Sequence, residues 1–219
     1  MKYTKTIITF GAMMSLSACL GSGSDDDYVT KADVEALATK AAAAVEPAEE
    51  ELSGTATMTG VAILELGDTP LLAGDPVVGN MEVTADFEEG KITGAATNLA
   101  FYTVEGEGEE ATIGQVDEYI TGQLDLVGTI SEDDFVGDLT GDLSYSESQT
   151  VEGVAVTVDL SGDVTTTVDG SFLSNDGDLV AAADIEGSVV LSGSVTALGK
   201  TTDIDEAYVE ISGALVVSE

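Results

Sequence analysis

The 219-residue chain contains no arginine, histidine or tryptophan, and it has a single cysteine. Its six basic residues are all lysines, against 42 acidic residues, which gives a formal net charge of −36. Nucleic-acid binding requires clustered lysine and arginine, so we expect no nucleic-acid partner. The absence of histidine excludes histidine-based catalysis and histidine-ligated zinc, and one cysteine cannot form an intrachain disulfide.

The chain nevertheless has enough apolar material for a folded core. Hydrophobic residues make up 43% of it and the mean hydropathy is +0.20, so the high charge does not here indicate disorder. The length fits one domain of ordinary size preceded by a processed and tethering segment. Composition therefore predicts an acidic, folded protein that is secreted or exposed at a surface, and it names no activity.

The N-terminus has the features of a bacterial export signal. Lys2 and Lys5 precede an apolar run at 7–14, which is too short for a membrane span of about 20 residues. Residues 16–19 then read Leu-Ser-Ala-Cys, which resembles the lipobox of bacterial lipoproteins. The resemblance implies cleavage before Cys19 and acylation of its thiol. The alternative is an ordinary signal peptide followed by a chance cysteine.

We expect three parts: a signal peptide at 1–18, a lipidated tether with a short helix at 19–52, and a β domain at 53–219. The lipobox sets the first boundary, and the patterns described below set the second. Several acyl chains on Cys19 would make a durable anchor, because each buried CH₂ contributes about 0.8 kcal/mol. We therefore expect the protein to be attached through lipid to the bacterial outer membrane or the cell surface, and whether it faces the periplasm or the exterior stays open.

A short helix is predicted from Thr30 to about Val45. Thr30 is a favourable N-cap, the alanines at 41–44 favour a helix, and Pro47 ends it. The apolar residues form only a narrow stripe: Val34, Leu37, Ala41 and Val45. We expect a stalk that is marginal in water, and packing of the helix over one end of the β domain is the alternative.

From Ser53 onward, apolar and polar residues alternate with a period of two, which indicates strands with one buried and one hydrated face. Turn-forming residues occur at 88–91, 131–134 and 175–178. The clearest alternation lies in 81–87, 120–130, 135–146, 154–164, 185–193 and 209–217. Together with 53–65 and 91–104, these segments predict about eight long strands in an antiparallel meander.

Glycines inside the strands favour a barrel over a sandwich, which remains the alternative. A strand glycine destabilises unless it permits a sharp bend or a close backbone approach, as a small closed barrel requires. Ten fall within strands, mostly in phase with the apolar residues: Gly60, Gly94, Gly122, Gly128, Gly137, Gly141, Gly162, Gly187, Gly193 and Gly213.

Whether the apolar residues face inward or outward indicates if the barrel is surrounded by water or by lipid. A transmembrane barrel would crowd its lumen with Asp and Glu that have no basic partners, and aromatic residues, at 5%, are too few for two girdles. We therefore predict an all-β fold: a single soluble antiparallel β-barrel of about eight strands, with an apolar interior and an acidic exterior.

Several short motifs occur in an order that is known from one family of barrels. Segment 54–60 has the pattern Gly-x-Ala-x-x-x-Gly, 81–87 ends in Ala-Asp-Phe, and 90–94 closes on a glycine. A Phe-x-Gly element at 135–137 and a Gly-x-Phe element at 170–172 follow. Together they resemble the barrel domain of transferrin-binding protein B and of factor H-binding lipoproteins.

The resemblance covers much of 53–187, and it departs at 173–175, where Leu-Ser-Asn replaces an aromatic-glycine pair and a further strand pair follows. It implies a surface lipoprotein whose barrel carries loops that capture a protein or an iron- or haem-type solute. No ligand-contact residues carry over, because in that family they lie in variable loops.

The best candidate for a binding loop is the acidic segment between two strong strands. As the longest polar loop, it is a favourable place for partner contacts, and aromatic residues beside such a loop often anchor partners. Its candidate residues are Glu105, Glu107, Glu109 and Glu110, flanked by Phe101, Tyr102 and Tyr119. The alternative is a charged hairpin with aromatics packed in the core or at the barrel rim.

We predict no enzymatic site, because acidic residues are so frequent that a pair of carboxylates carries no specificity. The acidic turns at 132–134, 175–178 and 203–206 offer oxygen ligands for Ca²⁺. None has the spacing of an EF-hand loop or a glycine-rich calcium repeat, so solvated turns and no cofactor are expected.

Two functions remain open. One is a binding module that captures a solute or a protein, and the other is a structural or protective acidic coat without a specific ligand. A partner of the first should be basic or cationic, because the acidic surface steers cations and repels anions.

Overall fold

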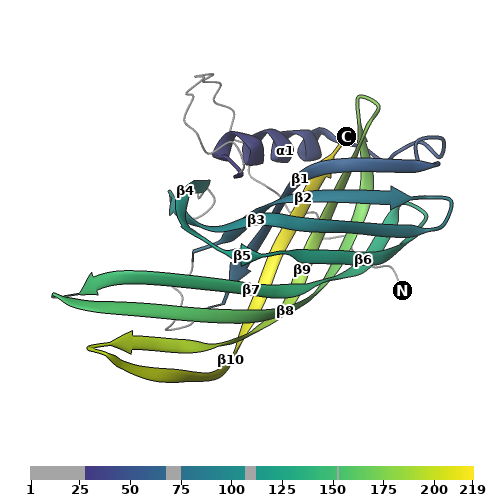
Figure 1. Cartoon of the computed structure of the whole chain (residues 1–219). Coiled ribbons are helices and arrows are strands. Elements are labelled where there is room, and N and C mark those ends of the chain that lie inside the picture. Colours follow the sequence, from purple (N-terminus) through teal and green to yellow (C-terminus); the bar gives the residue numbers. More distant parts are fainter. Residues whose placement is uncertain (1–27, 68–74, 107–111, 152) are drawn as a thin grey trace.

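The computed structural model describes residues 28–67, 75–106, 112–151 and 153–219. Within these ranges one helix, α1 (Lys31–Ala43), precedes the strands (Figure 1). The strands are β1 (Thr55–Leu66), β2 (Val77–Asp86), β3 (Lys91–Glu105), β4 (Thr112–Tyr119), β5 (Thr121–Gly122), β6 (Leu124–Ser131), β7 (Asp134–Val151), β8 (Val154–Asn175), β9 (Asp178–Ala197) and β10 (Lys200–Ser218). No helix in the described ranges is long and apolar enough to cross a membrane.

The strands form one antiparallel sheet that closes into a ring. β1 pairs with β2 on one side and with the last strand, β10, on the other. The β2–β3 pairing completes the order β1-β2-β3-β6-β7-β8-β9-β10. β4 pairs with the second half of β3, and β5 pairs with β7, so β4, β5 and β6 act as one interrupted strand. The prediction of a single antiparallel barrel of about eight strands is confirmed by this ring of 8.

β8 displays the predicted alternation most clearly, since every second residue from Leu160 to Ser174 is buried. The strand continues beyond 164, where the predicted segment ends. The prediction stops there because three consecutive threonines at 165–167 hide the alternation of apolar and polar residues. Thr166 is buried among them, and its hydroxyl donates to the Leu139 carbonyl oxygen at 2.9 Å. The predicted turn at 175–178 is present, with Asp176 and Gly177 both at positive φ (54° and 94°), as a two-residue hairpin turn requires.

Side chains fill the barrel interior. Three aromatic rings meet near one end of it: Phe172 lies 5.0 Å from Phe87 and 5.1 Å from Phe135, measured between ring centroids. At Gly60 the strands approach so closely that an added Cβ would lie 2.1 Å from the carbonyl oxygen of Val216 on β10. This close approach is the role that the strand glycines were predicted to have.

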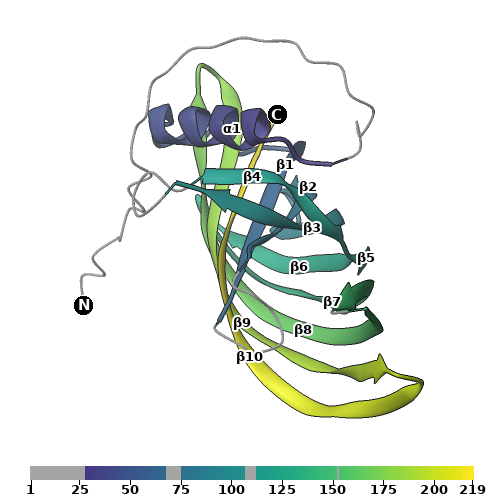
Figure 2. The same cartoon turned by 90° about the vertical axis from the view of Figure 1, so that its left-hand side faces the viewer.

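The prediction that α1 forms a stalk is wrong, because the helix packs on the barrel wall (Figure 2). Val34 and Leu37 pack against outward-facing residues of β1 to β4, including Val61 and Tyr102. The stripe on the helix is narrow, but the wall beneath it is apolar as well. A helix that is marginal alone is therefore stabilised by this contact.

Both ends of α1 are tied to the barrel. At the N-terminal end Thr30 caps the helix, as predicted, in a capping box with Asp33, and Lys31 Nζ lies 3.2 Å from Glu105 Oε2. Beyond the C-terminal end Val45 forms a bridge with Ser174 of β8. The helix therefore ends before the predicted limit at about Val45.

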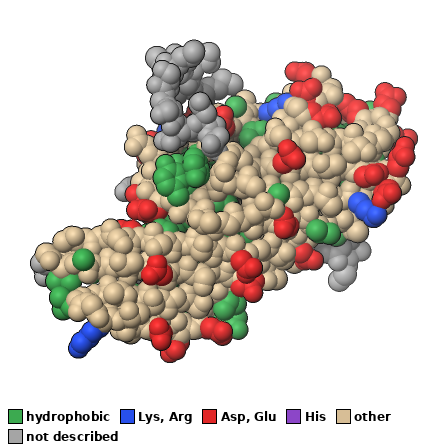
Figure 3. All heavy atoms as spheres, viewed as in Figure 1, with side chains coloured by type: hydrophobic (Ala, Val, Ile, Leu, Met, Phe, Trp, Pro, Cys, Tyr) green, Lys and Arg blue, Asp and Glu red, His purple; other side chains and the backbone are tan. Residues whose placement is uncertain are grey.

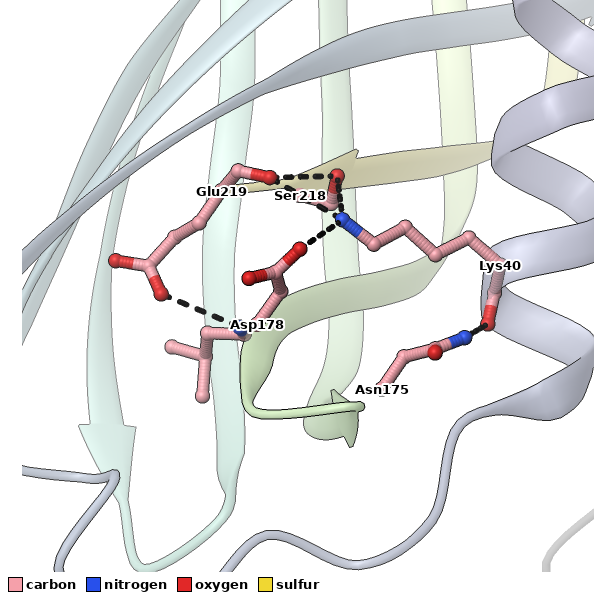
Figure 4. Close-up of polar contacts among 6 residues, drawn as sticks. Lys40, Asn175, Asp178, Ser218 and Glu219 are labelled. Atoms are coloured by element: carbon pink, nitrogen blue, oxygen red, sulfur yellow. Dashed lines mark hydrogen bonds and ion pairs between the residues drawn. The ribbon is translucent and has the colours of Figure 1, made fainter.

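Lys40 makes the main connection at the C-terminal end of α1 (Figure 4). Its ammonium group lies 2.9 Å from Asp178 Oδ2, and it also donates to Ser218 Oγ at 3.1 Å and to the Glu219 carbonyl oxygen at 3.2 Å. Asn175 Nδ2 donates to the Lys40 carbonyl oxygen at 2.7 Å. These contacts join the helix to the β8–β9 turn and to the end of β10.

Candidate functional site

The four longest strands continue beyond the ring as an open sheet (Figures 1 and 2). On one side β5 pairs with β7 no further than Ser144, and on the other β1 pairs with β10 no further than Ile211. Past these points the β7–β8 and β9–β10 hairpins pair only with each other among the described strands. We name residues 145–151, 153–160 and 193–209 the extension.

One face of the extension continues the apolar interior of the barrel, and we name this face the trough. Cross-strand pairing places its apolar side chains together: Tyr145, Val151, Val154, Val156, Val158, Leu160, Val195, Ala197 and Ile204. Four polar or charged residues share this face, nearer its edges and tips: Glu147, Gln149, Lys200 and Thr202. The opposite face is polar, with Ser146, Ser148, Thr157, Asp159, Ser194, Thr196 and Asp203. Exposure increases along the trough, because Leu160 beside the barrel is buried whereas Val151 near the tip is 48% exposed.

The tip of the β9–β10 hairpin carries an unusual leucine. Leu198 is 80% exposed and has a φ of 53°, and Gly199 follows it with a φ of 72°. This left-handed region suits Gly, Asn or Asp, and the branched side chain gains nothing from packing there. Leu198 is therefore unfavourable for the fold in both conformation and exposure.

A small cavity lies where the trough meets the barrel. It has a volume of about 50 Å³ and is lined by Leu66, Val77, Phe101, Ile120, Tyr145 and Leu160, among others. The rings of Phe101 and Tyr145 meet edge to face, with centroids 5.5 Å apart. Pockets for organic ligands usually measure about 300–1,000 Å³. This end of the barrel is therefore too full to enclose a small-molecule ligand.

A second, more open cleft of about 560 Å³ lies between α1 and the outer face of β1 to β3. Asp33, Glu82 and Glu219 line it together with Thr59 and Leu37, and no lysine is among its described lining residues. Its lining is acidic but otherwise mixed, and it selects no particular ligand.

Carboxylates flank the trough on both sides. On the β10 side, Asp203, Asp205 and Glu206 are exposed, and none of them forms an ion pair with a described residue. Figure 3 shows acidic side chains spread over the face in view, with few lysines among them.

On the β7 side the carboxylates gather around Tyr145. Its hydroxyl donates to Glu147 Oε2 at 2.8 Å, and Glu118 and Asp117 lie close enough to act on it electrostatically. Burial, followed by the Glu147 hydrogen bond and these charges, raises the pKa of Tyr145. The apolar trough thus has negatively charged borders.

Of the predicted binding-loop residues, the structure separates Phe101 from the others that it describes, whereas Tyr102 and Tyr119 both lie near Tyr28 on the outer wall. Phe101 lines the small cavity where the trough meets the barrel. Tyr102 is instead buried on the outer wall, where its hydroxyl donates to the Val29 carbonyl oxygen at 2.7 Å. Tyr119 is half exposed and packs against Tyr28, with ring centroids 4.7 Å apart, while Glu105 pairs with Lys31. The remaining candidates lie outside the described residues: Glu107, Glu109 and Glu110.

Within the described ranges, no three His, Cys, Asp or Glu side chains are grouped so that they could hold a metal ion. Two carboxylates in or beside the predicted acidic turns instead have structural partners. Asp134 Oδ1 accepts a hydrogen bond from Ser171 Oγ at 2.6 Å, and Asp178 pairs with Lys40.

No family model, curated protein or solved structure matches this chain. Cys19 and the segment before Tyr28 lie outside the described residues. The trough and its carboxylate borders are therefore the features from which a function can be inferred.

Proposed function

We propose that this protein is a lipid-anchored lipoprotein of the bacterial surface and that the trough captures a protein partner. The observation that carries the proposal is the row of apolar side chains on one face of the extension, which become more exposed toward the tips. Contiguous apolar surface of this kind is unfavourable in water, and in folded proteins it marks interaction sites.

The proposed anchor rests on the lipobox at 16–19. Replacement of the lipidated thiol, Cys19→Ala, should move the protein from the membrane fraction to the soluble fraction. Tight retention of the Cys19→Ala variant in the membrane fraction would contradict the lipoprotein assignment.

The filled interior favours a protein partner over a solute. The resemblance to transferrin-binding lipoproteins implies either a protein or an iron- or haem-type solute. A cavity of about 50 Å³ at the mouth is far smaller than a haem site requires. The trough, in contrast, offers an extended surface of the kind that proteins recognise.

Two adjacent residues of β8 provide a matched test of the trough. Val158 lies on the trough side and Thr157 on the outer side, and both are partly buried. We expect Val158→Asp to abolish the capture of an envelope or medium protein, because it places a charge in the apolar contact, whereas Thr157→Asp should retain it. Immobilised full-length chains compared by cross-linking and pull-down provide the measurement. Equal capture by both variants and the wild type would contradict a role for the trough.

The alternative, an acidic coat without a specific ligand, is supported by the excess of carboxylates. Only three ion pairs occur among the described residues, and Asp169 and Asp184 lie directly opposite each other on neighbouring strands. For a coat protein without a ligand, Val158→Asp would not change the amount of partner protein captured. Its melting temperature should rise equally with Na⁺ and with Ca²⁺ at matched ionic strength, because screening alone would relieve the repulsion.

A further inference from the structure

The extension has two edges that pair with no other described strand, and the edge of β10 is protected against pairing. Between Lys200 and Val209 this edge carries Asp203, Asp205 and Glu206. The register with β9 also shifts between Ile204 and Ala207. Charges and bulges of this kind are how native sheets prevent another strand from adding to an edge.

The edge of β7 has less of this protection, a single charge on the trough side, Glu147. From Tyr145 to Val151 its register with β8 is uninterrupted, and β8 is its only pairing partner among the described strands. Glu147 is the only charged residue in this stretch, which contains no proline. The backbone groups that point away from β8 therefore have no described strand beside them.

We propose that a β-strand of a partner protein, apolar on one face and basic on the other, adds to the edge of β7 between Tyr145 and Val151. The proposal rests on the proposed function of the trough and specifies the chemistry of its partner. In this mode main-chain hydrogen bonds supply affinity, and alternate side chains supply specificity.

The trough side of β7 is apolar at its two ends, Tyr145 and Val151, with Glu147 and Gln149 between them, so it favours apolar side chains at the ends of the added strand. Alternate residues of that strand would lie beside Tyr145 and Val151 and would extend the apolar face formed with Val154. Each of these residues is now partly or largely exposed, and the added strand would cover them.

The outer side of β7 selects basic side chains. Ser146 and Ser148 lie there, and Ser146 Oγ donates to Asp159 Oδ1 of β8 at 2.6 Å. Nearer the barrel, Asp142 and Asp163 face each other across the same two strands. Lysine or arginine on the outer face of the added strand would lie across Ser146 from the Asp159 carboxylate, and Glu147 adds a carboxylate on the trough side.

A second copy of this chain fits the edge less well than a basic partner. A formal charge of −36 on each copy opposes association, and β7–β7 pairing would supply no cation to the carboxylates of either edge. An anionic lipid surface is disfavoured for the same reason.

The test uses the full chain and a labelled peptide, matched in length to Tyr145–Val151, in which valine and lysine alternate. Fluorescence anisotropy at physiological salt gives the dissociation constant of the peptide from the full chain. A peptide with the same sequence, N-methylated at alternate residues, keeps the side chains but cannot pair as a strand. We expect it to bind at least about tenfold more weakly. Equal binding of the two peptides would overturn strand addition, because charge alone would then explain the affinity.

The Val158→Asp and Thr157→Asp variants locate the contact. We expect Val158→Asp to weaken the alternating peptide at least about tenfold and Thr157→Asp to leave it unchanged or tighter, since the added carboxylate lies on the basic side. Dimerisation of the free chain through β7, or vesicle binding that Val158→Asp removes, would overturn the proposal. If the peptide does not bind but Val158-dependent capture of an envelope protein persists, the strand proposal fails and the proposed function stands.

Discussion

The barrel and the extension consist of the same long strands, yet they differ in what faces their apolar side. On β8, Val164, Val168 and Phe172 are buried against the opposite wall, whereas Val156 and Val158 of the same strand are partly exposed. The strands that close the ring are too short to cover the rest. β1, β2 and β3 have 12, 10 and 15 residues, against 18 to 22 for β7 to β10. Differences in strand length, at constant pattern, decide which apolar face is buried.

The outer wall beneath α1 extends this comparison. There too the sheet carries apolar residues outside the barrel, such as Val61 and Val78, but the chain covers them with its own helix. The trough is the apolar face for which the described chain provides no such helix, and this contrast is why we interpret it as a contact surface.

The largest expected effect on stability comes from truncating a core side chain of the barrel, and it should far exceed the effect of a similar truncation in the extension. Phe172→Ala should lower the free energy of unfolding by about 3–5 kcal/mol, because it leaves a cavity in the core. Val156→Ala should cost less than about 1 kcal/mol, because its side chain is already partly hydrated. Urea denaturation measures both. Similar costs for the two variants would mean that the trough is covered in solution.

A glycine in the closed wall should be nearly as sensitive. Gly60→Ala should destabilise the barrel by about 1–3 kcal/mol, because the new methyl group would meet the backbone of β10. Gly67→Ala is the matched control, since its Cβ would lie 3.3 Å from the nearest atom, the Glu210 carbonyl oxygen, rather than 2.1 Å from one as at Gly60. If both variants melt at the same temperature, close approach of the strands is not what requires Gly60.

The covered wall should respond to alkaline pH. Burial, followed by the nearby Tyr119, Tyr28 and Asp33, raises the pKa of Tyr102 to about 12. The folded state thus holds this proton more tightly than the unfolded state, so the stability it contributes is complete below pH about 10 and is lost as pH rises toward about 12. Tyr102→Phe should reduce this loss while costing about 1 kcal/mol at neutral pH for the bond to Val29. If the stability of the Tyr102→Phe variant falls with rising pH as steeply as that of the wild type, ionisation of Tyr102 is not the cause of the loss.

The smallest effect, and the one of opposite sign, is expected at the tip of the extension. Leu198→Asn should stabilise the fold by about 0.5–1 kcal/mol, because asparagine suits the left-handed turn conformation. Asp176, which occupies the equivalent position in the β8–β9 turn at a φ of 54°, already has a favourable side chain. A loss of stability in Leu198→Asn would show that the leucine contacts the extension after all.

Much of the fold could be predicted because it depends on local pattern. Alternation identified the eight strands of the ring but missed β4, Thr30 indicated the start of the helix, and Asp176-Gly177 indicated a hairpin turn. The position of α1 could not be predicted from its own narrow stripe. The relevant signal was the unbroken apolar run at 61–64 in β1, which indicates a strand buried on both faces.

The candidate site was harder to predict. Phe101 and Tyr102 are consecutive residues of one strand and therefore point to opposite faces, so strand geometry alone separates two of the proposed loop residues. The trough was missed because alternation in 154–164 predicts a buried face without indicating what lies opposite it. That depends on where β1 and β5 stop, which is a property of other parts of the chain.

Hydrogen exchange at residue resolution, with and without the alternating valine–lysine peptide, tests the trough as an open docking face most directly. We expect slower exchange for the amides of Tyr145–Val151 that do not bond β8, and no change in β10 between Lys200 and Val209. Unchanged exchange along β7, or protection confined to the outer wall around α1, would contradict this expectation.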